Sequence, residues 1–529
     1  MVFISCDVLY DVGMKILYLA AEVAPFVKVG GLSQVMYYLP RALAKRGHDV
    51  RVFTPGYGSM DPAAVQKRRL KLQPETWSFA VPTAMEGQPQ GEDGPADDIH
   101  CTVRAYRPAD KDAWIYFLEN KEYYELRANV FGYADDHVRF ALMSKACLEW
   151  LRAMREAVDN DEEGAWWPDV IHCHDWHSSY CIDLARRDKR YRDLLAGTTI
   201  VLTVHNFKYQ ANGDLRYVAD EERDDGVKLL APLNDKRLQK QNALKRGLKF
   251  ADAVTTVSPT HAIEVLTPEY AEGLDDTLQE IRGKLSGILN GIDTDEFDPS
   301  EDPIIRQRYS KWRFVSAREA NKKHLQREFS LPLDPDAFML AYVGRLSSQK
   351  GLDLLTEALP QLLREREDVQ FVAVGGGDDR YRASLEALKQ EFPDQVGLYL
   401  MPDFRLPRKV FSGADVVLMP SLFEPGGIVA LEALRYGAVP LVRRTGGLND
   451  SIVEFDPETK EGNGFSFTQK SPWSLYGAIM TALATHRHRS LWERLVTNAL
   501  DCDFSWDPVA KEYEAWYRSA MQERKRNTR

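Results

Sequence analysis

The chain has 529 residues, more than a single hydrophobic core usually holds, so we expect two domains and an extension. Its 44% hydrophobic and 28% charged residues are typical of a globular protein, and its net charge of −11 disfavours nucleic acid or an anionic membrane as the main partner. No apolar run reaches the ~18 residues of a membrane span, and the six cysteines are scattered with no Cys-x-x-Cys pair. These features predict a reduced, cytoplasmic setting without a disulfide framework.

Short, continuous apolar runs alternate with amphipathic stretches along most of the chain, as is typical of buried parallel strands connected by helices. We expect strands at 15–20, 49–54, 169–173, 199–204 and 253–257, and again at 338–343, 369–374, 415–419 and 438–442. This pattern predicts two α/β domains, each with a doubly wound parallel sheet. We place them at 14–297 and 298–490, divided by a polar connection that carries several prolines, with C-terminal helices over 491–529.

A basic residue followed at short distance by Gly-Gly-Leu occurs in both halves of the chain. The two copies read Lys28-Val29-Gly30-Gly31-Leu32 and, 416 residues later, Arg444-Thr445-Gly446-Gly447-Leu448. Paired glycines let the backbone approach a bulky ligand and offer N–H groups to an anion, and the cation adds charge for phosphate. One such turn is common, but two copies in opposite halves predict a two-lobed enzyme that closes on one phosphorylated ligand.

The stretch from Leu418 to Ala433 predicts a strand, a Gly-rich turn and the start of a helix. Glu424 lies on the turn together with Gly426 and Gly427, and a helix N-terminus of this kind attracts anions. Glu424 is placed to accept hydrogen bonds from sugar hydroxyls, and Glu432, about 80° further round the helix, to hold a ribose. The alternative is a capping carboxylate and a solvated helix glutamate, which the second Gly-Gly-Leu copy nearby disfavours.

Two cations, Arg345 and Lys350, follow the first strand of the second domain. Ligands of open α/β sheets bind beyond the carboxyl ends of the strands, so both side chains should face the ligand. Arginine can bind a diphosphate through two hydrogen bonds, and lysine can neutralise the charge that grows on a leaving phosphate. A solvated pair of loop cations is the alternative interpretation.

Polar residues also end two strands of the first domain. Asp175 follows the strand at 169–173, and His205 and Asn206 end the strand at 199–204. A lone histidine at a strand end is usually structural, but two such strand ends in one domain favour sugar binding.

Two motifs suggest a metal site, and we favour other interpretations of both. His172, His174 and His177 surround Asp175 at spacings that do not suit a tetrahedral zinc site. Asp293-Thr294-Asp295 matches the Asp-x-Asp pattern of metal-dependent sugar transferases, but its place before the connection favours turn and cap chemistry. We therefore predict no metal.

Taken in order, these segments resemble the bacterial glycogen synthase and plant starch synthase family of retaining glucosyltransferases, from about residue 14 to Tyr517. The segments that carry the resemblance are 28–32, 174–177, 203–206, 209–210, 256–260, 289–293, 321–323, 325–326, 345–351, 424–427, 445–448, 463–465 and 504–506. The resemblance implies the GT-B fold, in which two Rossmann-like doubly wound domains face a deep interdomain cleft and a C-terminal helix crosses back to the N-domain.

The resemblance also implies a reaction: transfer of glucose from ADP-glucose or UDP-glucose to the non-reducing 4-OH of an α-1,4-glucan, without cofactor, nucleic acid or membrane. Catalytic roles would fall to Arg345, Lys350, Glu424 and His205. Substrate-binding roles would fall to Lys28, Gly30, Gly31, Asp175, Asn206, Asn290, Gly426, Gly427, Glu432, Thr445, Gly446 and Gly447. Because no motif supplies an obvious carboxylate for double displacement, we favour a front-face route in which the departing diphosphate helps to deprotonate the acceptor.

The chain departs from the family pattern mainly on the sugar side. The family usually has Asp two residues after the first Gly-Gly-Leu, Cys where Gly426 stands, Trp where Phe297 stands and Gly where Ala211 stands; here Ser33-Gln34 follow the first motif. A related retaining enzyme with a different acceptor is therefore one alternative.

Two further alternatives come from other functional classes. A non-catalytic glucan-binding paralogue would keep the fold, but the joint presence of Lys28, Arg345, Lys350 and Glu424 disfavours it. A NAD-dependent dehydrogenase is disfavoured because no Gly-x-Gly-x-x-Gly follows a strand with an acidic residue about 20 positions on.

Overall fold

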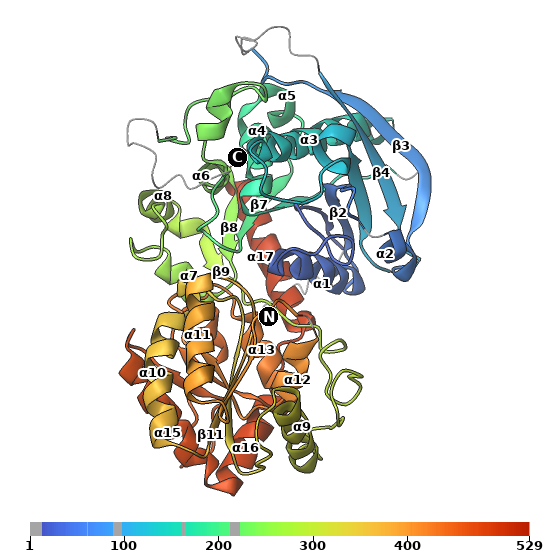
Figure 1. Ribbon diagram of the computed structural model, residues 1–529. Coiled ribbons are helices and arrows are strands. Elements are labelled where there is room, and N and C mark those ends of the chain that lie inside the picture. The colour runs from blue at the N-terminus through green and yellow to red at the C-terminus, as the bar shows by residue number, and fades with distance from the viewer. Residues whose placement is uncertain are drawn as a thin grey trace, which may run out of the picture. The chain divides into compact units, whose positions relative to one another are not determined.

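The computed structural model describes residues 13–60, 62–87, 98–109, 111–160, 162, 165–211, 223–403 and 405–527. These residues form two compact units, each built around its own β-sheet (Figure 1). The first unit contains the described residues up to Thr255, residues 266–286 and those from Ala510 on, and the second contains residues 256–265 and 287–509.

Among the described residues, the sheet of the first unit has nine strands in the order β3-β4-β5-β2-β1-β6-β7-β8-β9. The strands are β1 Lys15–Leu19, β2 Asp49–Pro55, β3 Lys71–Val81, β4 Ile99–Arg107, β5 Trp114–Glu119, β6 Val170–His174, β7 Thr199–Val204, β8 Ala253–Thr256 and β9 Leu285–Gly287. From β5 to β7 all neighbours run parallel, whereas β3, β4 and β5 pair antiparallel. The chain order reverses between β1 and β6, and ligands of such sheets bind at this point.

In the part of the chain that the structure describes, the second sheet has six strands in the order β12-β11-β10-β13-β14-β15, and all neighbours are parallel. The strands are β10 Phe338–Val343, β11 Val369–Val374, β12 Val396–Tyr399, β13 Val416–Met419, β14 Val439–Arg443 and β15 Phe465–Phe467. In this Rossmann-like order the reversal falls between β10 and β13.

Helices cover both sheets. Those of the first unit are α1 Gly31–Lys45, α2 Pro62–Lys67, α3 Asp136–Asp159, α4 Asp175–Arg187, α5 Lys189–Arg192, α6 Ala243–Phe250, α8 Asp275–Glu280 and most of α17 Trp506–Asn527, with a π-helical turn at Lys121–Glu125 and 3-10 turns at Lys236–Lys240 and Arg282–Lys284. Those of the second are α7 Pro259–Glu264, α9 Val315–Glu328, α10 Leu352–Glu365, α11 Asp379–Glu391, α12 Leu406–Gly413, α13 Ile428–Arg435, α14 Gly446–Ser451, α15 Pro472–His486 and α16 Arg489–Leu500, with a 3-10 turn at Ser348–Lys350. Figure 1 shows α10, α11 and α15 on one side of the second sheet and α9 and α12 on the other.

The strands that the apolar runs predict are all present, each within one residue at either end. Their side chains are buried on both faces, as in β1, where Ile16, Leu17, Tyr18 and Leu19 have no exposed surface. The doubly wound parallel sheets are therefore confirmed. Burial from both sides explains why these strands give continuous rather than alternating apolar runs.

Strand β3, at the antiparallel edge of the first sheet, has no continuous apolar run in its sequence. Most side chains of β3 are exposed or half-buried, and its pairing with β4 is irregular between Leu72 and Thr76, on either side of Pro74. Edge strands tolerate proline and charge because one side of the strand makes no ladder bonds. The absence of an apolar run in the sequence follows from this exposure.

Residues 256–265 and 287–297 lie with the second unit, whereas the sequence predicts a boundary at 297. The backbone explains the difference. Ile288 N–H donates to the Thr256 carbonyl, and Ile292 N–H donates to the Phe504 carbonyl, so residues 287–297 bond to other residues of the second unit.

The last helix, α17, packs on the first sheet. The Tyr517 hydroxyl lies 2.6 Å from the Tyr18 hydroxyl on β1 and 2.7 Å from Nδ1 of His172 on β6. Arg46 donates to Glu514 at 2.9 Å, and near the end of the helix Arg524 pairs with Asp252 at 3.1 Å. From Ala510 on, α17 is therefore an integral part of the first unit.

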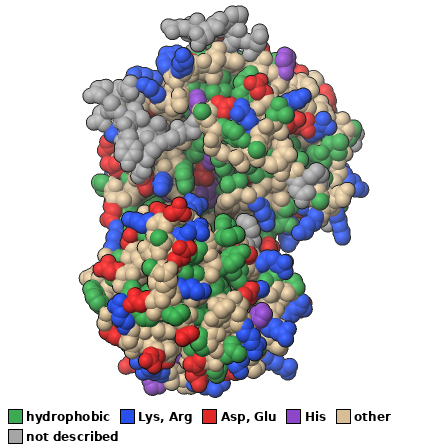
Figure 2. Space-filling model, in the orientation of Figure 1, with side chains coloured by type: hydrophobic (Ala, Val, Ile, Leu, Met, Phe, Trp, Pro, Cys, Tyr) green, Lys and Arg blue, Asp and Glu red, His purple; other side chains and the backbone are tan. Residues whose placement is uncertain are grey.

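The surface charges, the helices and the cysteines match what the amino-acid composition predicts. Figure 2 shows Lys and Arg interspersed with Asp and Glu over the visible face. In the described ranges, the helices include none with the length and apolar character needed to span a membrane. The described cysteines, Cys101, Cys147, Cys173, Cys181 and Cys502, are free thiols.

Candidate functional site

The candidate residues of the first unit follow the carboxyl ends of three neighbouring strands. Lys28 comes after β1, Asp175 begins α4 directly after β6, and His205 and Asn206 come directly after β7. Because β1, β6 and β7 are adjacent and parallel, these residues lie at one edge of the sheet, next to the point where the strand order reverses. The sheet thus brings together residues that are far apart in sequence.

Asp175 has an unusual backbone and a perturbed carboxyl group. Its φ of 56° lies in the left-handed region, which residues other than glycine adopt rarely. Its Oδ1 accepts the His205 backbone N–H at 2.7 Å. The side chain is half-buried. Its burial raises the pKa of the carboxyl to about 7, although hydrogen bonds from the His205 and Asn206 backbone N–H groups lower it. A carboxyl that titrates near neutral pH can exchange a proton with a ligand.

Three histidine side chains lie beside Asp175, two of them buried and one half-buried. His172 Nε2 lies 2.7 Å from the Thr203 hydroxyl, and His174 Nδ1 lies 3.0 Å from His205 Nε2. Burial lowers the pKa of all three rings, that of His205 to about 4. At neutral pH the rings are therefore uncharged, and His174 and His205 share one proton in their hydrogen bond. A neutral, half-buried His205 can donate or accept a hydrogen bond with a sugar hydroxyl.

The first Gly-Gly-Leu copy leads into α1 and is bonded to a carboxylate of the chain. Glu22 is 3% exposed, and its Oε2 accepts the backbone N–H groups of Val29 at 2.7 Å and Gly30 at 3.1 Å. In this structure the Gly30 N–H is therefore bonded to a carboxylate of the chain itself, whereas the sequence predicts a ligand anion there. Gly31 begins α1, and the Lys28 side chain is exposed.

In the second unit, Lys350 and Glu424 form an ion pair. The Lys350 Nζ lies 2.5 Å from Glu424 Oε2, which also accepts a hydrogen bond from the Ser421 hydroxyl at 3.0 Å. Lys350 follows β10 and Glu424 follows β13, and these strands are neighbours at the reversal of the second sheet. Both side chains keep part of their surface exposed, 26% for Lys350 and 14% for Glu424. The pair is thus fixed yet open to a ligand.

Glycines allow the turns around this pair. Gly351, directly after Lys350, has a φ of 71°, and a Cβ there would lie 1.9 Å from the Pro420 carbonyl oxygen. Gly427, three residues after Glu424, has a φ of 65° and precedes α13. Only glycine adopts these left-handed conformations without strain at such close approach. Arg345 lies on the same β10 turn, where the Tyr342 hydroxyl donates to its carbonyl at 2.6 Å.

Asn290 lies next to Gly426. A Cβ added at Gly426 would lie 3.2 Å from Asn290 Nδ2, so the glycine leaves room for the amide side chain. Asn290 is 4% exposed, and within the described residues its Oδ1 has no hydrogen-bond partner. Buried polar atoms are nearly always bonded in folded proteins, so an unpaired one marks a place for a ligand or water.

Glu432 lies two turns along α13 from the Gly-rich turn. Burial raises the pKa of its carboxyl to about 8, with Arg408 lowering it and Glu296 raising it. The side chain keeps partial solvent exposure. A carboxyl that is largely protonated at neutral pH can donate a hydrogen bond as well as accept one, which suits a hydroxylated ligand.

The second Gly-Gly-Leu copy begins α14 and is also bonded to a carboxylate. Glu264, at the end of α7, accepts the Thr445 hydroxyl at 2.9 Å and the Gly446 N–H at 3.1 Å. The Gly447 N–H donates to the Glu424 carbonyl at 3.0 Å. In this structure the N–H groups of Gly446 and Gly447 therefore donate to acceptors of the chain itself.

Known proteins provide independent evidence on the family. The starch synthase catalytic domain family matches residues 15–280, and the group 1 glycosyl transferase family matches residues 325–499. A glycogen synthase of Desulforamulus reducens is 34% identical over 96% of this chain and 99% of its own length. Those of Geobacillus thermodenitrificans and an Anaeromyxobacter species are 36% and 37% identical, also over 96% of this chain, and cover 98% and 99% of their own lengths.

The chain belongs to the glycogen and starch synthase family.

Solved structures agree with this membership. The catalytic domain of starch synthase IV from Arabidopsis thaliana, bound to ADP and acarbose, is 29% identical with a TM-score of 0.76, covering 96% of this chain and all of that one. A sucrose-phosphate synthase from Thermosynechococcus elongatus, 19% identical with a TM-score of 0.55 over 96% of this chain and 99% of its own, shares the fold. The predicted family and the GT-B class of two Rossmann-like sheets are confirmed, and the protein is a glycosyltransferase.

Two glutamates that shape the site of this glycogen synthase family member are marked by no motif in the sequence. Glu22 accepts the Gly30 N–H and Glu264 accepts the Gly446 N–H, but neither glutamate belongs to a glycine-rich or charged motif. Glu264 is 181 residues from Thr445 in the chain. A contact over that distance gives no local pattern, so only the fold shows it.

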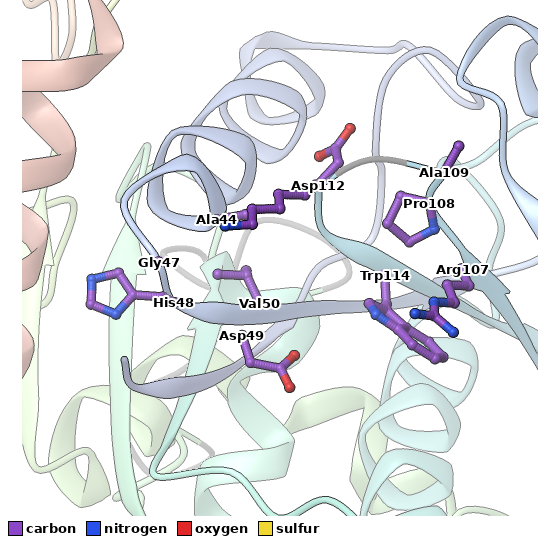
Figure 3. A pocket seen from close by; sticks show the side chains of 11 residues that line it. Ala44, Gly47, His48, Asp49, Val50, Arg107, Pro108, Ala109, Asp112 and Trp114 are labelled. Carbon is purple, nitrogen blue, oxygen red and sulfur yellow. The ribbon is translucent and has the colours of Figure 1, made fainter. Parts of the chain in front are cut away.

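One pocket of the first unit lies away from these residues. It has a volume of about 540 Å³ and is lined by residues such as His48, Asp49, Arg107 and Trp114, at the start of β2 and the end of β4 (Figure 3). Asp49 is the first residue of β2, so the pocket lies at the edge of the sheet opposite to Asp175 and His205. It contains none of the candidate site residues that the sequence predicts in this glycosyltransferase.

No group of three or more His, Cys, Asp or Glu side chains that could hold a metal ion is found in the described ranges of the chain. Of the three histidines around Asp175, His172 bonds to Tyr517 and Thr203 and His174 bonds to His205. The ring of His177 packs against Phe140 at 4.7 Å between ring centroids.

Proposed function

We propose that this glycosyltransferase moves glucose from ADP-glucose or UDP-glucose to the 4-OH at the non-reducing end of an α-1,4-glucan, with retention at the anomeric carbon. The observation that carries the proposal is the Lys350–Glu424 pair at the strand reversal of the second sheet. It combines a cation for the leaving diphosphate with a carboxylate for sugar hydroxyls, in a family whose named members are glycogen synthases.

The donor's diphosphate is bound by cations in this proposal. Arg345 binds the diphosphate through two hydrogen bonds. Lys350 neutralises the charge that grows on the leaving oxygen, and Lys28 adds a third positive charge. Glu424 accepts hydrogen bonds from the glucose hydroxyls, assisted by Asn290 and the turn at Gly426 and Gly427. Lys350 has three N–H donors, so it can keep Glu424 in place while it donates to a phosphate oxygen.

The remaining residues bind the rest of the substrates. Glu432 holds the ribose of the nucleotide, and Thr445, Gly446 and Gly447 shape the wall beside the donor sugar. His205, Asn206 and Asp175 line the glucose and acceptor side, with Gly30 and Gly31 next to Lys28. The Asn290 Oδ1, which has no hydrogen-bond partner in the part of the chain that the structure describes, supports the role of Asn290. The raised pKa of the Asp175 carboxyl supports the role of Asp175.

The reaction proceeds on one face of the sugar. The bond from the anomeric carbon to the diphosphate breaks, the acceptor 4-OH forms the new bond on the same face, and its proton passes to the departing diphosphate. The cations lower the cost of the charge on the leaving group. Exclusion of water protects the donor from hydrolysis. The setting we expect is the cytoplasm, and the substrates are the nucleotide sugar and the glucan alone.

The test is a transfer assay with ADP-[14C]-glucose or UDP-[14C]-glucose, with and without glycogen, in which labelled polymer and free glucose are separated. Glycogen-dependent incorporation into polymer is the expected result, and it should be much slower in Lys350→Ala. Donor hydrolysis without polymer labelling, or label in another acceptor, would favour the related transferase. Binding of glycogen without turnover of either donor would favour the non-catalytic paralogue.

A further inference from the structure

The two Gly-Gly-Leu loops share a contact that their sequences do not show. Each donates a backbone N–H to a glutamate outside the motif, Gly30 to Glu22 in the first unit and Gly446 to Glu264 in the second. We propose that Glu22 and Glu264 are positioning residues that hold the two loops in their binding conformation before any ligand arrives. The proposal rests on the proposed function, because that function assigns Lys28 and Thr445 to the substrates.

Glu22 fixes the backbone on the C-terminal side of Lys28. Its Oε2 accepts Val29 N–H and Gly30 N–H, and Ser33 N–H also bonds to the carboxylate. These donors belong to the start of α1, where Gly30 is the capping residue and supplies no side chain. The carboxylate thus replaces a capping side chain and complements the positive end of the helix. Lys28 itself stays exposed.

The burial of Glu22 shows that this contact is built in. Glu22 is 3% exposed, and burial, with the nearby Asp175 carboxyl adding to it, raises its pKa. Burying a carboxylate is unfavourable unless hydrogen bonds compensate, and the donors that do so here come from the loop. Loop and carboxylate therefore hold each other in one geometry, and a loop ordered in advance binds its ligand at a smaller entropy cost.

Glu264 does the same for the second loop through a different element. From the end of α7, its Oε1 accepts the Thr445 hydroxyl at 2.9 Å and both of its oxygens lie 3.1 Å from Gly446 N. Gly446 has a φ of 43°, and a Cβ there would lie 2.1 Å from the Glu424 carbonyl oxygen. The loop that Glu264 holds therefore packs directly on the backbone of Glu424, a residue of the proposed donor site.

The first test measures loop order without any ligand, by amide hydrogen exchange of the full-length protein. We compare wild type with Glu22→Ala, Glu22→Gln, Glu264→Ala and Glu264→Gln. We expect Glu22→Ala to speed exchange of residues 29–33 at least ~10-fold and to leave residues 445–449 unchanged, and Glu264→Ala to do the reverse. Each variant is thus the matched control of the other. The Gln variants keep an acceptor oxygen, so we expect a smaller increase of about 3-fold.

The second test separates positioning from general damage by steady-state kinetics. We expect each Ala variant to raise the donor KM ~10-fold with a smaller change in kcat, and each Gln variant to restore most of the affinity. Wild-type exchange in the matching loop of both Ala variants would overturn the proposal, as would equal losses in the Ala and Gln variants. If an Ala variant does not fold, the Gln variant decides by the same exchange criterion. Faster loop exchange in a protein that transfers no glucose would keep the positioning role and refute the proposed function.

Discussion

The ammonium of Lys350 lies 2.5 Å from a carboxylate oxygen of Glu424, although 74 residues separate them in the chain. The contact exists because β10 and β13 are neighbours in the second sheet, so the turns after both strands meet. An ion pair this short holds the lysine in one orientation while its partial exposure leaves it open to substrate.

Replacing this lysine tests its role in departure of the diphosphate. We expect Lys350→Ala to lower kcat by ~10²-fold or more, because charge on the leaving oxygen is no longer neutralised. The measurement is nucleotide release at saturating donor and glycogen. Lys350→Arg keeps the charge and should retain more activity than the alanine variant. Turnover near the wild-type rate in Lys350→Ala would remove the residue from the mechanism.

Asp175 should make stability depend on pH. Its folded pKa is about 7, above the ~3.9 of an unfolded aspartate, so the folded state keeps the proton where the unfolded state has lost it. The free energy of unfolding therefore falls as the pH rises from about 4 to 7. Asp175→Asn removes this loss, and asparagine tolerates the φ of 56° and still accepts the His205 N–H.

We therefore expect Asp175→Asn to be more stable than wild type by about 1–2 kcal/mol at pH 8, a value reduced for partial solvent exposure. The difference should grow between pH 5 and pH 8 in urea unfolding and level off above about pH 8. The control is Asp379→Asn, at an aspartate whose side chain is 97% exposed. A difference that does not change with pH would contradict the raised pKa. Activity should fall in Asp175→Asn at the same time.

Tyr517 should contribute to stability through its hydroxyl. Tyr517→Phe removes the shared partner of Tyr18 and His172, which are both fully buried, so we expect a loss of about 1–3 kcal/mol in the free energy of unfolding. Urea titration measures the loss. Tyr399→Phe, at a tyrosine that is 37% exposed, should change stability by ~0.5 kcal/mol or less. Equal effects of the two variants would show that the hydroxyl contact is not important.

Gly426 should affect the donor site through Asn290. In Gly426→Ala the new Cβ lies 3.2 Å from Asn290 Nδ2 and 3.4 Å from Val257 Cγ2, so the amide has to shift by a few tenths of an ångström. We expect a several-fold higher donor KM with a stability cost of about 1 kcal/mol or less, because one methyl group is a small overpacking. Gly477→Ala is the matched control, since a Cβ there meets nothing within 4 Å. An unchanged donor KM in Gly426→Ala would separate Asn290 from donor binding.

The parallel parts of the fold could be predicted from the sequence because their strands are buried on both faces. Continuous apolar runs such as Phe338–Val343 mark such strands within a residue. The antiparallel edge with β3 could not, since its exposed side chains and Pro74 give no apolar pattern. Strand ends could also be predicted, and with them the places of Asp175, His205, Arg345 and Glu424 at the carboxyl edges of the sheets.

The contacts among site residues could not be predicted from the sequence. The glycine motifs predict amides that are open to an outside anion, whereas Gly30 and Gly446 donate to Glu22 and Glu264. Nothing near Glu264 in sequence distinguishes it from a solvated helix glutamate. Its role depends on α7 lying against α14, which only the folded backbone determines.

The packing of α17 has a practical consequence for dissecting the protein. A fragment that stops at Ser286 would lack the helix that covers Tyr18 and His172, and it would expose aromatic and imidazole surface that is buried in the whole chain. Adding a synthetic peptide of residues 506–527 should restore this cover. The N-terminal Rossmann unit is thus best produced as a two-piece protein, and the affinity between the pieces would report how strongly the tail secures it.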